Sequence, residues 1–529
     1  MKKYILPFLS LGLLTACVED EGNYNYKHLN VIEIQGIEES YAPLAYMDNV
    51  TISPVLSGSL AGTDLSNYDY QWHLCLSTHG NHLVISQEKD LDWPADLSPG
   101  TYSLYFTVKD RSTGLEKQAR TQLNVGSPYL RGFLVLGDDM EAGHARLDML
   151  CMPLQRDTAY AKGVIDNPIG AVGAHEMIFS GYGAVNEGDQ YLWMLTDDGS
   201  YALEYQEVIS VINEFNESDL VEIEIPHKTP MRVRDAFPRQ GGQPNSVNGT
   251  SQNRSRTYRG LIFDDIVVIS NKMSGGYGGA VNRYSATSND YFTPYPKAFI
   301  QATKTFALDD LEQSLVYDMD NQCFARFAGS YLTYMVLVPD YYSGGAWNLE
   351  IGKDNRHLIY AENGLNLYGE DNPIYMLVKD NDEDNYYIMY FSGHRTKFNP
   401  RPYYPNKSPL YKVNPATAVD IDKASHYMFS SNRLVLLYSV GNRLYQYSFT
   451  NGTCISHDFD GEITYLEAEY SSTCSIKDYF VATYNEATGK GMIYKMEVPA
   501  TANAGFSFLE GQQWETDLRV RDIEWKWPN

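Results

Sequence analysis

The sequence has little positive charge for its length. Its 529 residues contain 41 lysines and arginines against 67 aspartates and glutamates, which gives a formal net charge of −26. A chain this acidic repels phosphate backbones and anionic lipid headgroups, so neither nucleic acid nor an anionic membrane surface is expected as a main partner. Long apolar runs are also scarce. No stretch after the amino-terminal one is apolar enough to span a bilayer as a helix.

Cysteines are few and do not form a framework. Six are present, and setting aside Cys17 leaves an odd number, five. No Cys-x-x-Cys pair or clustered Cys/His spacing occurs, so no metal site is expected. Cys454 and Cys474 can pair only if their strands are neighbours, and this stays open. The others lie in apolar, strand-like runs and are expected to be buried: Cys75, Cys151 and Cys323.

Catalytic motifs are absent as well. His175-Glu176 is followed by Met-Ile-Phe, so the second histidine of a zinc-protease helix is missing. No Gly-x-Ser-x-Gly elbow occurs, and the 11 histidines are scattered. A pair of carboxylates for glycoside hydrolysis stays open, since sequence alone cannot select one. We therefore expect no catalytic residue, no cofactor and no enzymatic activity.

One acidic run invites a metal interpretation. Asp380 to Asn385 is rich in oxygen ligands, yet it lacks the glycine and the terminal glutamate of an EF-hand calcium loop. A hairpin turn between the flanking apolar segments explains it more simply. Calcium binding is the less favoured alternative.

The amino terminus has the pattern of an export signal. Lys2 and Lys3 precede an apolar core, Ile5 to Leu14, that is too short to span a bilayer. It ends in Leu14-Thr-Ala-Cys17, which resembles a bacterial lipobox. The resemblance implies a signal peptide over 1–16 and a mature chain that begins at a lipidated Cys17. An ordinary secretory signal with a chance cysteine is the alternative.

An acidic run follows the proposed anchor. Val18-Glu-Asp-Glu21 resembles the export signal of Bacteroidota lipoproteins, which implies display on the outer face of the outer membrane. Several acyl chains would make such an anchor effectively permanent. The alternative is a solvated tether without an export role. In either case we interpret residues 17–28 as an acidic tether.

Residues 29–126 are predicted to form an immunoglobulin-like or PKD-like β-sandwich. Short strands alternate with turns, and the segments Tyr68 to Leu74 and Thr101 to Asp110 alternate with a period of two. About seven short strands in about a hundred residues are typical of this fold. Trp72 is predicted to be its buried tryptophan.

The amino-terminal region resembles a known family. The run from Cys17 through Tyr-Asn-Tyr, the strand Tyr-Asp-Tyr-Gln-Trp72 and the strand beginning Pro-Gly-Thr-Tyr102 are similar to the PKD-like lipoproteins of Bacteroidota. Members are commonly encoded beside SusC/SusD-type importers of glycans or peptides. The resemblance therefore implies an outer-membrane location and a role in nutrient uptake. It implies no ligand and no catalytic residue.

Residues 127–529 are predicted to form a β-propeller. Strand–turn–strand units recur at roughly fifty residues with almost no helical periodicity, which favours about seven or eight blades. Turns are predicted at Asp197-Asp-Gly199, Gly441-Asn442 and Asn485 to Gly489. The last strand, from Leu518, is predicted to close the ring against the strand starting at Gly132. Two or three further β-sandwiches are the alternative.

Three loop regions are candidates for binding. A polar insertion from Phe237 to Gly260 carries arginines and is interpreted as either a mobile loop or a docking loop. A Gly-rich stretch around Tyr277 and a set of aromatics near glycine and proline suit stacking on a ligand, or else simple connection and rim packing. The docking candidates are Arg239, Arg254 and Arg256, and the ligand-binding candidates are Tyr277, Tyr341, Tyr342, Trp347, Tyr403 and Tyr404.

Together these features favour a non-catalytic surface lipoprotein. We expect it to be an accessory of a SusC/SusD-type uptake system that binds a glycan or peptide, or docks on the importer. The alternatives are a surface glycoside hydrolase or polysaccharide lyase with a propeller domain, and a purely structural subunit.

Overall fold

The computed structural model of the chain has two compact units, divided between Gly126 and Ser127. This is where the sequence pattern placed the boundary between sandwich and propeller. The structure describes residues 28–76, 82–154, 156–166, 170–180, 191–204, 209–215, 228, 232–237, 258–271, 277–300, 314–327, 333–338, 340, 346–363, 373–395, 403–430, 434–471, 476–499 and 504–526. The predicted signal peptide, Cys17 and nearly all of the predicted tether therefore lie outside the described residues.

The first unit is a β-sandwich. One layer is a five-stranded sheet in the order β2-β9-β8-β5-β6, and the two-stranded sheets β1-β4 and β3-β7 complete the unit. Its strands are β1 (Ile32–Gln35), β2 (Ser40–Tyr41), β3 (Asn49–Ile52), β4 (Val55–Gly58), β5 (Tyr68–Cys75), β6 (His82–Ser86), β7 (Leu91–Pro94), β8 (Gly100–Asp110) and β9 (Glu116–Val125).

The alternation in the sequence sets the core of the sandwich. Along β8, Leu104, Phe106 and Val108 are buried while the residues between them are more exposed. Trp72 is fully buried, its ring centroid lies 4.4 Å from that of Phe106, and its indole N–H donates to the Lys89 carbonyl at 3.2 Å. The prediction of a buried tryptophan is confirmed.

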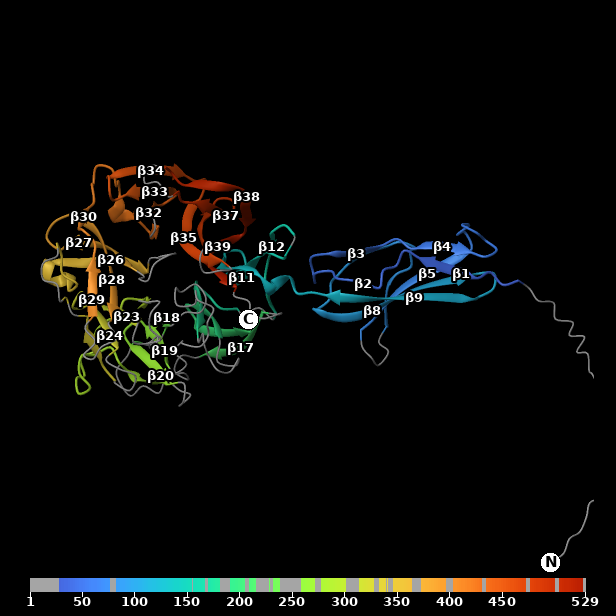
Figure 1. Cartoon of the computed structure of the whole chain (residues 1–529), viewed down its shortest axis with the longest axis horizontal. Coiled ribbons are helices and arrows are strands. Elements are labelled where there is room, and N and C mark those ends of the chain that lie inside the picture. The colour runs from blue at the N-terminus through green and yellow to red at the C-terminus, as the bar shows by residue number, and fades with distance from the viewer. Residues whose placement is uncertain are drawn as a thin grey trace, which may run out of the picture. The chain divides into compact units, whose positions relative to one another are not determined.

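The second unit is a propeller of seven blades within the described residues (Figure 1). Blade 1 joins β10 (Gly132–Asp139), β11 (His144–Cys151), β12 (Ala159–Ala161) and β39 (Leu518–Lys526). Blade 2 comprises β13 (Ile165–Asp166), β14 (Ala174–Ser180), β15 (Tyr191–Thr196), β16 (Ser200–Glu204) and β17 (Ile209–Phe215). Blade 3 comprises β18 (Val233–Phe237), β19 (Tyr258–Phe263), β20 (Val267–Asn271) and β21 (Tyr277–Ala280).

The remaining four blades continue the ring. Blade 4 is β22 (Phe299–Ile300), β23 (Ser314–Asp318), β24 (Cys323–Phe327) and β25 (Met335–Leu337). Blade 5 is β26 (Arg356–Asn363), β27 (Ile374–Asp380), β28 (Tyr386–Arg395), β29 (Tyr403–Lys407) and β30 (Tyr411–Lys412). Blade 6 is β31 (His426–Ser430), β32 (Val435–Val440), β33 (Arg443–Ser448) and β34 (Thr453–Asp458). Blade 7 is β35 (Glu462–Ser471), β36 (Ile476–Asn485), β37 (Lys490–Glu497) and β38 (Ser507–Thr516).

The chain closes the ring with its last strand. β39 pairs antiparallel with β10 over Gly132↔Lys526 to Asp139↔Leu518, so the predicted closure is confirmed. It lies at the inner edge of blade 1 and contacts the inner strands of both neighbouring blades, β14 and β35. The predicted turns are also confirmed, since Gly441-Asn442 joins β32 to β33 and Asn485 begins the turn into β37.

The hydrophobic core of the propeller lies between adjacent blades. One cluster joins Phe133 of blade 1 to Phe480 of blade 7, and similar clusters join each pair of consecutive blades from blade 2 to blade 7. Middle strands such as β32, Val-Leu-Leu-Tyr-Ser-Val, are therefore buried on both faces and read as continuous apolar runs. Short 3₁₀ turns complete the described elements: η1 (Pro128–Leu130), η5 (Ile351–Asp354) and η6 (Ile421–Lys423).

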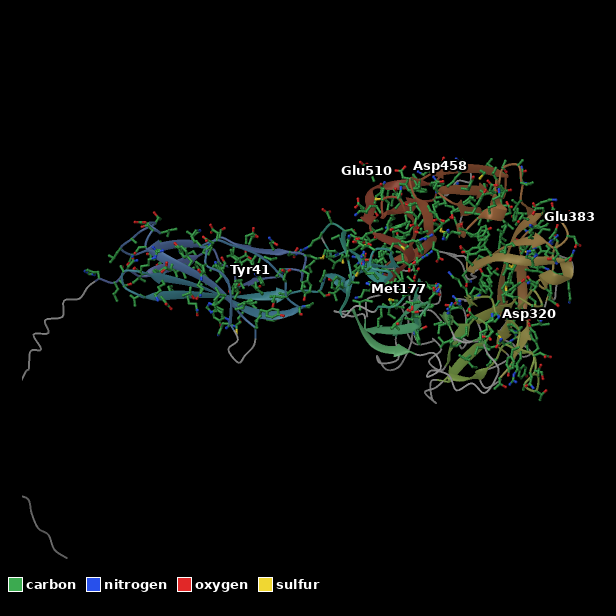
Figure 2. The ribbon with its side chains drawn as sticks, turned by 180° about the vertical axis from the view of Figure 1, so that it is seen from behind. Tyr41, Met177, Asp320, Glu383, Asp458 and Glu510 are labelled. Carbon is green, nitrogen blue, oxygen red and sulfur yellow. The ribbon has the colours of Figure 1, made fainter. Side chains whose placement is uncertain are left out.

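Several acidic residues of the propeller are exposed. Asp320, Glu383, Asp458 and Glu510 are exposed at its periphery, whereas Met177 of the inner strand β14 is buried (Figure 2). Asp380 to Asn385 forms the hairpin between β27 and β28, with Asn385 donating to Asp380 at 3.1 Å. None of the helices in the described residues has the length and apolar character needed to cross a bilayer.

Candidate functional site at the centre of the propeller

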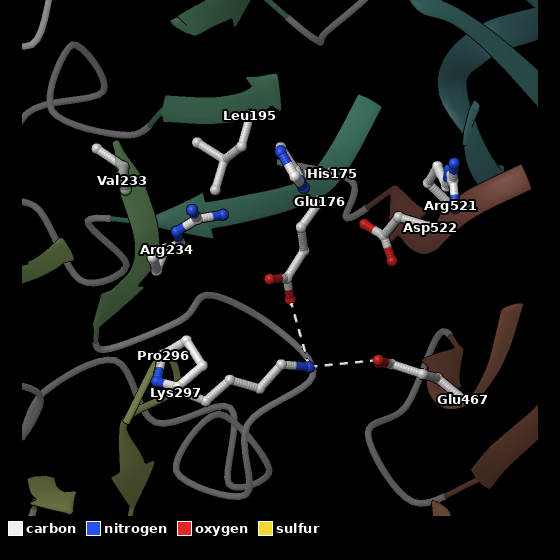
Figure 3. Close-up of a pocket in the computed structure, with 10 residues that line it drawn as sticks. All are labelled: His175, Glu176, Leu195, Val233, Arg234, Pro296, Lys297, Glu467, Arg521 and Asp522. Atoms are coloured by element: carbon white, nitrogen blue, oxygen red, sulfur yellow. Dashed lines mark hydrogen bonds and ion pairs between the residues drawn. The ribbon is translucent and has the colours of Figure 1, made fainter. Parts of the chain in front are cut away.

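A polar cavity of about 220 Å³ lies where the inner strands of five blades converge. Figure 3 shows charged side chains reaching into it from several directions. The lining residues come from β39, β14 with its neighbour β15, β18, the segment before β22, and β35: His175, Glu176, Leu195, Val233, Arg234, Pro296, Lys297, Glu467, Arg521 and Asp522. Blades 2, 3 and 4 follow one another in the sequence, and closure of the ring brings β35 and β39 from the far end of the chain beside them.

Three β-bulges place charged residues at this cavity. In β39, Asp522 pairs with Leu136 and Val520 with Gly137, so Arg521 is an extra residue. Bulges of this kind bend a strand and redirect a side chain.

The next two inner strands have bulges at the same level. In β14, His175 and Glu176 together oppose Leu195 of β15. In β18, Arg234 is the extra residue between Val233 and Asp235. Each of the three bulges therefore contributes at least one charged residue to the lining of the cavity.

The bulge itself is a recurring feature of the blades. β26 has an extra residue at Ile359 and β35 has one at Thr464. Those two positions are uncharged, whereas the bulges of blades 1, 2 and 3 contain Arg521, Glu176 and Arg234. The bulge therefore belongs to the architecture, and among these bulges only those of blades 1, 2 and 3 contain a charged residue.

A four-residue sequence repeat underlies two of these bulges. Arg-Val-Arg-Asp occurs at 232–235 in blade 3 and again at 519–522 in blade 1. The first arginine of each copy reaches the preceding blade: Arg232 binds Asp197 at 3.3 Å, and Arg519 binds Glu462 and Glu486, each at 3.2 Å. Both copies therefore connect neighbouring blades in the same way.

The second arginine of each copy lines the cavity, and the aspartate that follows it binds the next blade. Arg234 binds Asp264 and Arg521 binds Asp138, in each case through Nε, at 2.5 and 2.8 Å. The aspartate of each copy accepts a hydrogen bond from a backbone amide of the next blade. Asp522 accepts from the Met177 amide at 2.6 Å, and Asp235 accepts from the Ala298 amide at 2.7 Å.

Charges of both signs meet across the cavity. The Lys297 ammonium lies 3.7 Å from a Glu176 oxygen and 3.3 Å from a Glu467 oxygen, so it bridges blades 2 and 7 (Figure 3). His175 binds Asp197 at 2.8 Å, and this hydrogen bond lowers the pKa of Asp197. Glu467 and His175 are about two-fifths exposed, at 42% and 39%, so both are accessible to a solute.

Trp347, one of the residues that the sequence suggested for ligand binding, lies away from the cavity. Trp347 is a correction, because only 2% of it is exposed. Its indole N–H donates to the Ser408 carbonyl at 2.9 Å, and the ring packs near Phe391 in the core between blades 4 and 5. It cannot stack on a ligand. An aromatic beside glycines in the sequence can thus still be a core residue.

Three other candidates lie in strands of the propeller. Tyr277 begins β21, and Tyr403 and Tyr404 begin β29, where they pair with Arg395 and His394; they are thus strand residues of blades 3 and 5. The remaining candidates lie outside the described residues: Cys17, Arg239, Arg254, Arg256, Tyr341 and Tyr342. Cys454 has a free thiol, and Cys474 also lies outside the described residues.

Sequence reasoning missed the cavity, although two signals pointed to it. The sequence pattern of His175-Glu176 suggested only a fragment of a metal motif, and Arg232 and Arg234 lie just before the arginine-containing insertion that begins at Phe237. The Arg-Val-Arg-Asp repeat, together with charged residues inside otherwise apolar strands, would have identified the inner strands of blades 1 and 3.

A model of the PKD-like family matches residues 17–170. The match covers the sandwich and continues into the propeller as far as β13. It begins at Cys17, the residue predicted to follow the signal peptide. No curated protein matches the chain.

Several solved structures are similar to the chain at low sequence identity. A quinoprotein alcohol dehydrogenase-like protein of Bacteroides thetaiotaomicron is 10% identical, with a TM-score of 0.38, and the match covers 95% of this chain and 100% of that one. The extracellular domain of a hybrid two-component system protein from the same species is 10% identical, with a TM-score of 0.31, over 91% and 67%. A Bacteroides ovatus protein of a mixed-linkage glucan utilization locus, solved with a heptasaccharide, is 12% identical, with a TM-score of 0.15, over 46% and 56%.

Proposed function

We propose that this protein is a non-catalytic lipoprotein of the outer-membrane surface that binds a ligand for a SusC/SusD-type importer. The observation that carries the proposal is the coincidence at Cys17. The lipobox-like Leu14-Thr-Ala-Cys17 ends a short apolar core, and the match to the PKD-like family begins at the same cysteine. The acidic residues that follow support export to the cell surface.

The propeller supplies the binding part of the proposal. Its central cavity combines partly exposed cations and carboxylates from five blades, and convergent polar groups in a cavity are what ligand recognition requires. In this proposal, the ligand is a glycan or a peptide that the importer takes up. Docking on the importer itself is a second role for the same protein.

Lipidation is tested with a matched pair of cysteine variants. Cells fed radiolabelled palmitate should label the wild type and Cys454→Ser, which removes a free thiol elsewhere. Cys17→Ser should lose the label and leave the membrane fraction. Protease added to intact cells should degrade the wild type if it is displayed on the surface. Label retained by Cys17→Ser, or full protection from protease, would contradict the proposal.

The importer and the absence of catalysis need separate experiments. Gentle solubilisation of native outer membranes should co-purify a SusC/SusD pair with the tagged protein. Incubation with a panel of polysaccharides should release neither reducing ends nor unsaturated sugars. If either product appears, the protein is a glycoside hydrolase or a polysaccharide lyase.

A further inference from the structure

Arg234 and Arg521, the two arginines at the bulges, have hydrogen-bond donors that face the cavity. Arg234 and Arg521 each bind one carboxylate through Nε, and their terminal nitrogens have no partner in the described part of the chain. Both guanidinium groups line the cavity, with 27% and 36% of their side chains exposed. The planar fork of a guanidinium matches a carboxylate better than it matches a neutral hydroxyl.

An acceptor and an apolar wall complete the cavity. Glu467 comes from blade 7, contacts Lys297 at 3.3 Å and keeps 42% of its side chain exposed. Leu195, Val233 and Pro296 form the apolar part of the lining. The site therefore offers cationic donors, a carboxylate and an apolar surface within one small space (Figure 3).

The size of the cavity limits what can enter it. Its volume of about 220 Å³ is below the roughly 300–1,000 Å³ of pockets for drug-sized ligands. It suits one residue of a polymer or one small molecule.

We propose that this cavity binds an amino-acid-sized zwitterion with an apolar side chain, such as a free amino acid. The ligand carboxylate binds the terminal nitrogens of Arg521 or Arg234, its ammonium binds Glu467, and its side chain packs on Leu195 and Val233. The inference rests on the binding role proposed above and selects peptide-derived ligands over glycans. A neutral sugar would desolvate these charges without supplying counter-charges, and no phenylalanine, tyrosine or tryptophan among the described residues lines the cavity for it to stack on.

Isothermal titration of the purified full-length protein in detergent tests this directly. Leucine is the probe, with leucine amide and N-acetyl-leucine as analogues that lack the carboxylate or the ammonium. The wild type should bind leucine and bind each analogue at least about tenfold more weakly, as the loss of a charge-assisted hydrogen bond implies. Neutral monosaccharides should not bind.

Substitutions at the cavity test which side chain binds the carboxylate of the ligand and which binds its ammonium. Arg521→Ala or Arg234→Ala should weaken the binding of leucine about tenfold and leave the affinity for leucine amide unchanged. Glu467→Gln should weaken the binding of leucine but not that of N-acetyl-leucine. Arg443→Ala, which removes an exposed arginine bound to Asp458 on blade 6, should bind like the wild type. Glu467 is half exposed, so its variant tests the site even if an arginine variant fails to fold.

Three results would overturn the inference. These are no leucine binding by the wild type, preferential binding of neutral sugars, and equal loss of affinity in Arg443→Ala and Glu467→Gln. Because the titration uses purified protein, its outcome is independent of lipidation and surface display. A failure here therefore leaves the proposed location intact.

Discussion

At the scale of single residues, paired charges in blade 1 secure the closing strand. Arg146 binds Asp148 through two nitrogens, at 2.9 and 3.0 Å, and also contacts Asp139 and Asp517. Asp517 immediately precedes β39 and also binds Lys162 at 2.6 Å. Asp148 is fully buried and accepts from Tyr160 and the Gly163 amide at 2.7 Å each. A carboxylate so surrounded is stable only while its partners remain in place.

The pH dependence of stability should report on Asp517. Burial by itself would raise the pKa of this carboxyl, but hydrogen bonds from Lys162 and Arg146 outweigh burial and lower it to about 2. An unfolded aspartate titrates near about 3.9. The stabilisation is therefore complete above about pH 4 and is lost as the pH falls toward 2, because the unfolded chain takes up the proton first.

Urea unfolding between pH 2 and pH 7 tests this. Asp517→Asn should be less stable than the wild type at neutral pH, and the difference should shrink below about pH 4. Asp458→Asn, which removes an exposed ion pair with Arg443, is the control and should have a smaller effect because solvent and salt screen that pair. A constant difference between Asp517→Asn and the wild type across this range would contradict the assignment.

At the scale of elements, the inner strands β39 and β18 each contain one bulge and a side chain that binds the next blade. Regular antiparallel pairing alone would alternate side chains between the two faces of the blade. The extra residue interrupts that alternation, so Arg521 and Asp522 both line the cavity while Asp522 also accepts a hydrogen bond from the Met177 amide of the next blade. The same arrangement in blade 3 shows that the short repeat is a structural unit.

Gly173→Ala should disturb the bulge of β14. Gly173 has φ +72°, and an added Cβ would lie 2.1 Å from the Asp197 carboxylate, which binds His175 and Arg232. We expect a loss of stability of about 1–3 kcal/mol from the strained backbone, plus the cost of displacing Asp197.

Gly143→Ala provides the matched control. Gly143 has φ +75° with nothing within 4 Å of an added Cβ, so only the backbone strain applies. Thermal unfolding of both variants should show the larger loss for Gly173→Ala. Equal losses would mean that Asp197 moves aside without cost.

At the scale of the whole molecule, two separate cores should unfold separately. The core of the sandwich surrounds Trp72, and one of the clusters between blades of the propeller contains Trp525 packed 4.8 Å from Phe133. Truncating a buried tryptophan costs about 3–5 kcal/mol. Units with their own cores are expected to give their own transitions.

Calorimetry of the two tryptophan variants checks this expectation. Trp72→Ala should lower the transition of the sandwich and leave that of the propeller in place, and Trp525→Ala should do the reverse. Each variant serves as the control of the other. A single transition that both variants lower equally would show that the two units unfold together.

The sequence by itself determined the class of fold, the hairpins and the closing strand. Alternation, apolar runs and turn residues are local, so Asp197-Asp-Gly199 and Gly441-Asn442 marked hairpins. The alternating residues from Leu518 marked a strand that was expected to pair with the strand starting at Gly132. Only the tertiary structure decided which residues line the cavity and whether Trp347 is buried. Arg521, Glu176 and Glu467 meet because ring closure and bulges unite distant inner strands, and Trp347 is buried because blades 4 and 5 pack around it. Contacts of this kind depend on the packing of blades, which local patterns do not encode.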